Sequence, residues 1–188
     1  RATIDRMKAL PCLLPVLLVS VAGAAGVPTD DPTVALKLPW TAGLKWAQAV
    51  DVTSAEGADI DVKLAAAQAQ MAAKGGGVVF FPAGEYKFKE TIKVLDGIIL
   101  RGAPPGGETD ARKEHYQIAS WIEFPKYEFK ATGNGTPVDT AFKAIEVADP
   151  ASTSNCGVVH LAINRGHVKF AEAEGFKCGR NRLVFGCI

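Results

Sequence analysis

Net charge, cysteine and long apolar runs are all scarce in this sequence, and each shortage weighs against a class of protein. The formal net charge is only +1 over 188 residues, so the charge gives no reason to expect nucleic-acid binding. The 4 cysteines include no Cys-x-x-Cys pair, which argues against a zinc site. The apolar stretch near the N-terminus is too short, and too broken by Pro11 and Pro15, for a good transmembrane helix. Linear spacing shows no Ser-His-Asp set and no carboxylate pair, so no catalytic residue can be named.

What the sequence has instead is a group of short β-forming runs within residues 74–102. Four runs rich in Val, Ile, Phe, Tyr and Thr lie at 78–81, 86–88, 91–94 and 98–102. Turn-forming residues separate them, as at Pro82-Ala83-Gly84 and Asp96-Gly97. The runs begin closer together than the ~8–12 residues typical of an antiparallel sandwich. This spacing predicts a solenoid with three short strands per coil, and a tight β-meander is the alternative.

An Ala-rich segment at 61–74 precedes these runs and should be helical. One face of the predicted helix carries the apolar residues Ile60, Leu64, Ala67 and Met71. That face would cover the open end of the stacked coils, where an uncapped coil exposes unpaired backbone groups.

Both ends of this helix carry residues with more than one interpretation. Asp59 or Asp61 would cap its N-terminus; the two could also bind Ca²⁺, although such a site takes about six to eight oxygens. Gly75-Gly76-Gly77 follows the helix rather than opening one, so it predicts a C-cap and not a phosphate-binding loop.

The segment Gly-Gly-Gly-Val-Val-Phe-Phe-Pro-Ala-Gly-Glu-Tyr-Lys-Phe at 75–88, with the runs at 91–94 and 97–102, resembles the pectate-lyase superfamily. More narrowly, it resembles the entrance of secreted β-helix proteins of the rhamnogalacturonase and epimerase-like kind. The resemblance covers roughly residues 40–188 and implies an all-β solenoid, a right-handed parallel β-helix with an N-terminal capping α-helix. Because complete members are considerably longer, we expect a truncated, N-terminal portion of such a protein.

The N-terminal residues predict an exported protein. Residues 7–24 combine a short basic start, an apolar core and a small-x-small end, which is typical of a secretory signal peptide. We therefore divide the chain into upstream residues 1–6, a signal peptide, a mobile leader at 25–38, and a cap with the first coils at 39–188. The expected location is secreted, periplasmic or cell-surface, with no stable membrane insertion after cleavage.

Two tryptophans near the start of the folded part have two interpretations. Trp40 and Trp46 flank a short loop, and an exposed Trp pair could stack on sugar rings. The alternative is that both pack over the end of the solenoid. Farther on, residues 103–140 interrupt the rhythm of strands, and 120–124 should form a returning strand.

Near the C-terminus, Cys156-Gly157 and Cys178-Gly179 each precede an apolar run, which predicts two stacked coils. This register places His160 under Arg182. Cysteines stacked in adjacent coils lie about 4.8 Å apart, within disulfide range, so a Cys156–Cys178 bridge could form. Buried free thiols are the alternative.

His160, Arg180 and Arg182 would form a basic strip suited to an acidic polysaccharide if all three face outward. A solvated surface beside acidic neighbours is the alternative. The family resemblance implies a polysaccharide lyase or glycoside hydrolase acting on an acidic or plant- or algal-type polysaccharide, and it allows Ca²⁺. No other cofactor is evident in the sequence. A non-catalytic surface or carbohydrate-binding β-helix, or a fragment without independent activity, are the other hypotheses.

Overall fold

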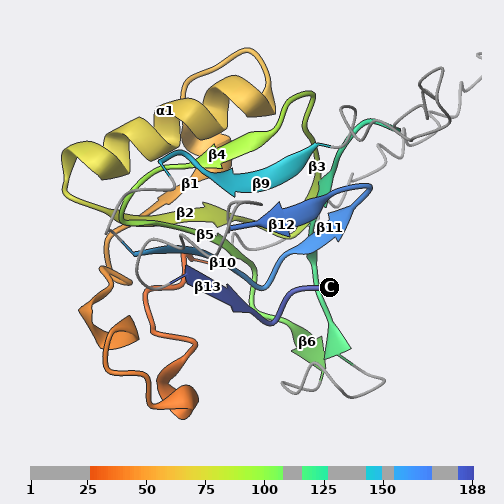
Figure 1. Ribbon diagram of the computed structural model, residues 1–188. Coiled ribbons are helices and arrows are strands. Elements are labelled where there is room, and N and C mark those ends of the chain that lie inside the picture. The colour runs from red at the N-terminus through yellow and green to blue at the C-terminus, as the bar shows by residue number, and fades with distance from the viewer. Residues whose placement is uncertain (1–25, 108–115, 127–142, 150–154, 171–181) are drawn as a thin grey trace, which may run out of the picture.

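The computed structural model describes residues 26–107, 116–126, 143–149, 155–170 and 182–188. Within them the chain is β-rich, mostly in parallel sheets, with one α-helix, α1 (Ile60–Ala73), and short 3-10 turns at Val34–Leu36, Thr41–Gly43 and Val52–Ser54. Figure 1 shows α1 lying across the first strands of the sheets.

Three parallel sheets contain nearly all the strands. Sheet A consists of β1 (Ala49–Asp51), β2 (Gly77–Phe81), β5 (Ile98–Gly102), β10 (Cys156–Val159) and β13 (Arg182–Phe185). Sheet B consists of β3 (Gly84–Lys87), β8 (Ser120–Glu123) and β11 (Ala162–Asn164), and sheet C of β4 (Ile92–Val94), β9 (Ala144–Val147) and β12 (His167–Lys169). A short antiparallel pair joins β6 (Gly106–Gly107) and β7 (Tyr116–Gln117).

The four runs predicted from the sequence are strands β2, β3, β4 and β5. The last of them, β5, pairs in parallel with the first, β2, so that Val79 lies opposite Leu100. A meander would instead pair neighbouring strands in antiparallel fashion, so these pairings exclude it for β2 to β5. The predicted returning strand at 120–124 is confirmed as β8.

Inward-facing side chains of the three sheets form one core. In sheet B the row Tyr86, Ile122 and Ile163 follows the register of β3, β8 and β11. Aromatic contacts connect successive positions, with the ring centroids of Phe81 and Tyr86 5.1 Å apart in an edge-to-face arrangement. The pKa of the buried Tyr86 phenol is raised to about 12, mainly because burial removes the phenol from water and secondarily because the Asp51 charge is nearby.

The helix and both of its caps agree with the sequence prediction. Leu64, Ala67 and Met71 are buried in the core, and the Asp59 side chain accepts a hydrogen bond from the Val62 backbone N–H at 3.2 Å. At the other end Gly75 adopts φ 77°. The Gly75 N–H donates to the Ala72 carbonyl at 2.8 Å and the Gly76 N–H to the Met71 carbonyl at 3.0 Å, the paired bonds of a Schellman C-cap.

The register predicted between the last two coils is wrong. Arg182 lies opposite Cys156, not His160, and Phe185 lies opposite Val159. In the observed register Leu183 lies opposite Gly157 and packs with Trp46 on the outer face of sheet A, not over Leu161 in the core. The spacing of the repeated Cys-Gly pair therefore does not set the pairing of β10 with β13.

Residues 26–48 cover the outer face of sheet A, and we call them the N-terminal cover. Trp46 packs there against Val78, Ile99, Val159 and Leu183. The interpretation of 25–38 as a mobile leader needs correction, because Thr33 is fully buried and Asp30 bonds Arg101 of β5.

The two tryptophans also lie on the side of a sheet, with Trp46 buried and Trp40 half-buried, rather than over the end of the strands.

Candidate functional site

His160, the first member of the predicted basic strip, does not face the solvent. It follows β10 with φ 53° and is only 8% exposed. Its ring centroid lies 5.7 Å from that of Phe185. Burial and the neighbouring Arg101 charge lower the pKa of His160 to about 4, against a smaller opposing effect of Asp30. A neutral, buried imidazole cannot take part in an exposed cationic strip at neutral pH.

The other members of the strip and the predicted disulfide are only partly described. Arg182 is half-buried at the start of β13, whereas Arg180 and Cys178 lie outside the described residues. Cys156 is a buried free thiol, and desolvation raises its pKa to about 11. The register that would have stacked Cys156 on Cys178 is lost, so their bridge stays a prediction without that geometric support.

Arg101 is a buried charge that sequence reasoning did not identify. Its side chain is 1% exposed on the outer face of sheet A, and its Nη1 and Nη2 atoms donate to the backbone oxygen and the Oδ1 atom of Asp30 at 2.6 and 3.0 Å. The guanidinium carbon lies 6.0 Å from the centroid of the Trp46 ring. These contacts attach the N-terminal cover to the sheet, so Arg101 has a structural role and is closed to ligands.

The outer face of sheet B, in contrast, presents a large aromatic side chain to the solvent. Trp121 on β8 is 41% exposed, and its Nε1 atom donates to the Ile118 carbonyl at 3.1 Å. Glu85 on β3 and Ala162 on β11 are its neighbours in the register of the sheet. Ala162 is fully buried although it shares the outward face with Trp121. Part of the indole reaches the solvent.

Charged side chains border this tryptophan along the next row of the sheet. Glu123 forms ion pairs with Lys87 at 3.9 Å and with Arg165 at 2.8 Å. We call Glu85, Lys87, Trp121, Glu123 and Arg165 together the Trp121 platform. The sequence predicted a strand here but not that Trp121 is exposed. The alternation of the strand puts Trp121 on the same face as Glu123 and opposite to Ile122, so the indole points away from the core.

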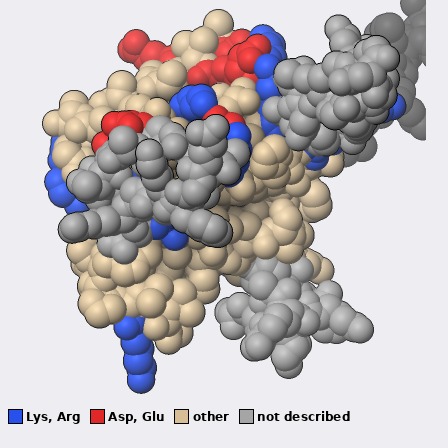
Figure 2. All heavy atoms as spheres, in the orientation of Figure 1, with Lys and Arg blue, Asp and Glu red and all other residues tan. Residues whose placement is uncertain are grey.

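Charges of both signs alternate on the described surface. On sheet C, Lys93 bonds Glu146 of the adjacent strand, and Lys169 follows in the same row. Figure 2 shows acidic and basic side chains intermingled along the upper part of the visible face, while the lower part carries few charges. The described surface therefore shows paired charges on sheets B and C rather than a basic strip.

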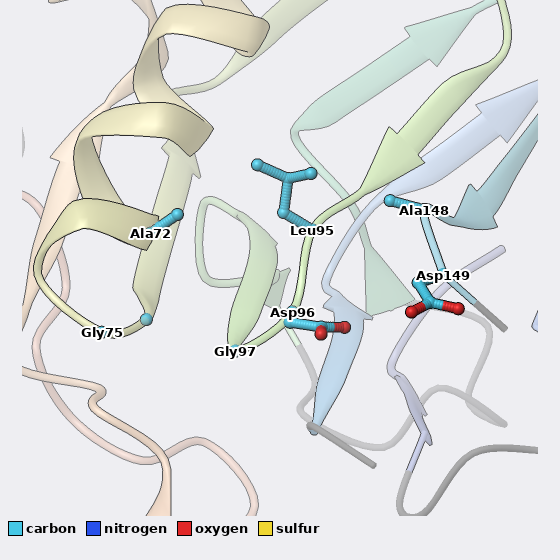
Figure 3. Close-up of a pocket in the computed structure, with 8 residues that line it drawn as sticks. Ala72, Gly75, Leu95, Asp96, Gly97, Ala148 and Asp149 are labelled. Carbon is cyan, nitrogen blue, oxygen red and sulfur yellow. The ribbon is translucent and has the colours of Figure 1, made fainter. Parts of the chain in front are cut away.

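A concave feature lies where sheet C leads into sheet A. A cavity of about 470 Å³ is bounded by the last turn of α1, by Gly75 and by the turns that carry Asp96 and Asp149. Figure 3 shows both carboxylates on the side of the pocket opposite to α1. Asp96 and Asp149 each have an interaction partner in the protein. Two acidic groups beside one cavity are compatible with binding of sugar hydroxyls or with acid–base chemistry.

The calcium interpretation of Asp59 and Asp61 finds an alternative explanation in the structure. Asp59 caps α1 and pairs with Lys89 at 2.7 Å, which lowers the pKa of its carboxyl. Asp61 accepts hydrogen bonds from the backbone N–H groups of Lys89 and Glu90. In the part of the chain that the structure describes, no three His, Cys, Asp or Glu side chains are grouped to hold a metal ion.

Comparisons of the chain with protein-family models, with curated proteins and with solved structures each find no match. The resemblance to the pectate-lyase superfamily stays a prediction. None of the helices in the described ranges is long and apolar enough to cross a membrane.

Proposed function

We propose that the chain forms the N-terminal cap and first coils of a secreted, right-handed parallel β-helix of the kind found in the pectate-lyase superfamily. The order of the strands supports this proposal, because from β2 onward the chain passes through sheets A, B and C in turn, apart from the antiparallel β6–β7 pair, and the strands within each of these three sheets pair in parallel. Helix α1 suits the role of the cap, since its apolar face enters the core and Gln68 bonds the backbone of Lys93 and Leu95 beside β4.

Such a protein binds a polysaccharide, and the outer face of sheet B is the surface that suits this function best. One observation carries the proposal: Trp121 is held by its hydrogen bond on a face of sheet B that no described segment covers, and the side chain is 41% exposed. Sugar rings present apolar C–H faces that pack on aromatic rings, and their hydroxyls bond carboxylates and amines around them.

Affinity gel electrophoresis of the purified chain against a panel of plant, algal and bacterial polysaccharides tests this function. Retardation by at least one polysaccharide, reversed by an excess of its free oligosaccharides, is the expected result. Unchanged mobility in every gel would overturn the proposal. A Lys93→Ala variant changes a charge on sheet C instead of sheet B, so it is the control for surface changes outside the proposed binding face. It should be retarded as strongly as the unmodified chain.

Glycoside hydrolysis is a second candidate function, and the cavity beside Asp96 and Asp149 is the observation that favours it. Hydrolases use paired carboxylates as acid and base or nucleophile. Release of reducing ends that disappears in both Asp96→Asn and Asp149→Asn, with folding retained, would support a hydrolase. An ultraviolet-absorbing unsaturated uronide would instead identify a lyase. If neither product is formed, the protein binds the polysaccharide without cleaving it.

A further inference from the structure

We propose that the Trp121 platform binds a neutral pyranose ring, stacked on the indole, and discriminates against uronates. This inference rests on the proposed polysaccharide-binding function and gives it a ligand class. A neutral sugar differs from the acidic polysaccharide that the predicted basic strip of His160, Arg180 and Arg182 suggested.

The indole is fixed before any ligand arrives. The hydrogen bond from Trp121 Nε1 to the Ile118 carbonyl, at 3.1 Å, holds the ring in one orientation. A fixed aromatic ring loses little conformational entropy on binding, so its contact area contributes more fully to the affinity. The exposed part of the ring suits a pyranose with mostly equatorial hydroxyls, because its axial C–H groups make both faces of the sugar ring apolar.

The charges around the indole decide which pyranose fits. Glu85 is exposed, lies directly beside Trp121 in the register of β3 and β8, and has no ion-pair partner among the described residues. Its carboxylate can accept hydrogen bonds from sugar hydroxyls. A sugar carboxylate in the same position would meet a like charge, which is destabilising.

The two cations of the platform do not reverse this preference. Lys87 and Arg165 both pair with the single carboxylate of Glu123, at 3.9 and 2.8 Å. A uronate would have to compete with Glu123 for them, whereas a neutral sugar can bond to the existing pairs at their edges. The platform as a whole contains two carboxylates and two cations, so it offers no net positive charge for an acidic polymer.

The decisive experiment compares neutral and acidic polymers on the full chain. Isothermal titration with oligosaccharides of β-1,4- and β-1,3-glucan and of xylan is set against titration with oligogalacturonate and oligoguluronate, at low salt. We expect binding of at least one neutral series and at least tenfold weaker binding of both acidic series. Trp121→Ala should weaken the neutral interaction by about tenfold, while Trp121→Phe retains most of it.

Glu85→Gln separates charge from hydrogen bonding, with Glu146→Gln on sheet C as the matched control. The first variant should narrow the preference for neutral over acidic oligosaccharides several-fold, and the second should leave it unchanged. Tighter binding of an acidic series, or neutral binding that survives Trp121→Ala, would overturn the platform proposal while leaving polysaccharide binding intact. Absence of any binding would overturn the proposed function itself, and thermal unfolding of each variant confirms that it is folded.

Discussion

Sheets A and B share one core, yet among the described residues the outer face of sheet A is covered and that of sheet B is open. On sheet A, β2 is buried at every position, since its inward residues meet the core and its outward residues meet the N-terminal cover. On sheet B, β8 alternates between buried and accessible residues, and Trp121 lies on its accessible side. A strand that is apolar on both faces needs a covering layer, whereas an alternating strand can face water directly.

Two tryptophans express this difference most directly. Trp46, a residue of the N-terminal cover, is 6% exposed and packs on sheet A, with its Nε1 atom donating to the Thr41 carbonyl at 2.9 Å. Trp121 has the same side chain and also bonds a nearby carbonyl, but no covering segment among the described residues buries it. The first contributes to stability, and the second is available for binding.

The largest expected effect is therefore on Trp46. Trp46→Ala should lower the free energy of unfolding by about 3 kcal/mol, because it removes a buried aromatic ring and leaves a cavity under the cover. Trp121→Ala should lower it by only about 1 kcal/mol, because the side chain is 41% exposed and its removal loses less buried area. Urea denaturation of both variants measures the difference. Equal losses of stability would mean that the two faces are not distinct, and the comparison would fail.

The sequence predicted those parts of the fold that depend on local chemistry. The four runs from 78 to 102, the caps at Asp59 and Gly75, and the buried face of α1 follow from propensity, turn residues and helical spacing. The N-terminal cover was missed although its signal was present, since Val78 and Phe80 are apolar at outward positions of β2. Which segment provides the cover depends on contacts between residues far apart in sequence, such as Asp30 and Arg101, and these leave no periodic pattern.

The candidate site was harder to predict, because exposure decides it. His160, Arg180 and Arg182 were selected for their charge, but charge does not show which side chains reach the solvent. His160 occupies a turn between β10 and β11, where its ring is buried next to Phe185. Trp121 gives the opposite case, because it would have been found by asking which large side chain the strand alternation directs away from the core.

The buried His160 makes the covered side sensitive to acid. Its pKa is about 4 when folded against an ordinary 6.5, and the groups that face it are Arg101 and Asp30. Between these values the unfolded chain binds more protons, so the stability present at pH 7 falls as the pH drops below 6.5. We expect a loss of about 2 kcal/mol between pH 7 and pH 5 from this residue.

His160→Gln isolates this contribution, because glutamine does not titrate. Urea unfolding of the variant and of the unmodified chain should show a smaller difference between pH 7 and pH 5 in the variant. The test uses the change in unfolding free energy between pH 7 and pH 5 and not the stability at pH 7, because the substitution can also alter packing at every pH. An unchanged pH dependence would show that His160 does not remain neutral in the folded chain.

The ion pair that attaches the cover should show a smaller but measurable coupling. A double-mutant cycle with Asp30→Asn and Arg101→Met should give about 1 kcal/mol of interaction energy. The value is moderate because the Asp30 side chain is 70% exposed, and its backbone carbonyl continues to bond Arg101 in the asparagine variant. Asp31→Asn is the matched control, since the Asp31 side chain bonds Thr33 within the cover. A control that couples to Arg101 as strongly as Asp30→Asn would contradict the assigned pairing.

The smallest effect should come from the equivalent pair on the open face. Arg165 and Glu123 are 2.8 Å apart, much like Arg101 and Asp30 at 3.0 Å, but the Arg165 side chain is 47% exposed and that of Arg101 is 1% exposed. Solvent screens the open pair, so a cycle with Arg165→Met and Glu123→Gln should give less than about 0.5 kcal/mol, falling further in 0.5 M salt. A coupling as large as that of the covered pair would imply that sheet B is shielded from water, and the Trp121 platform could not then admit a ligand as proposed. Near-zero coupling would mean instead that Lys87, Glu123 and Arg165 can rearrange around a bound sugar at little energetic cost.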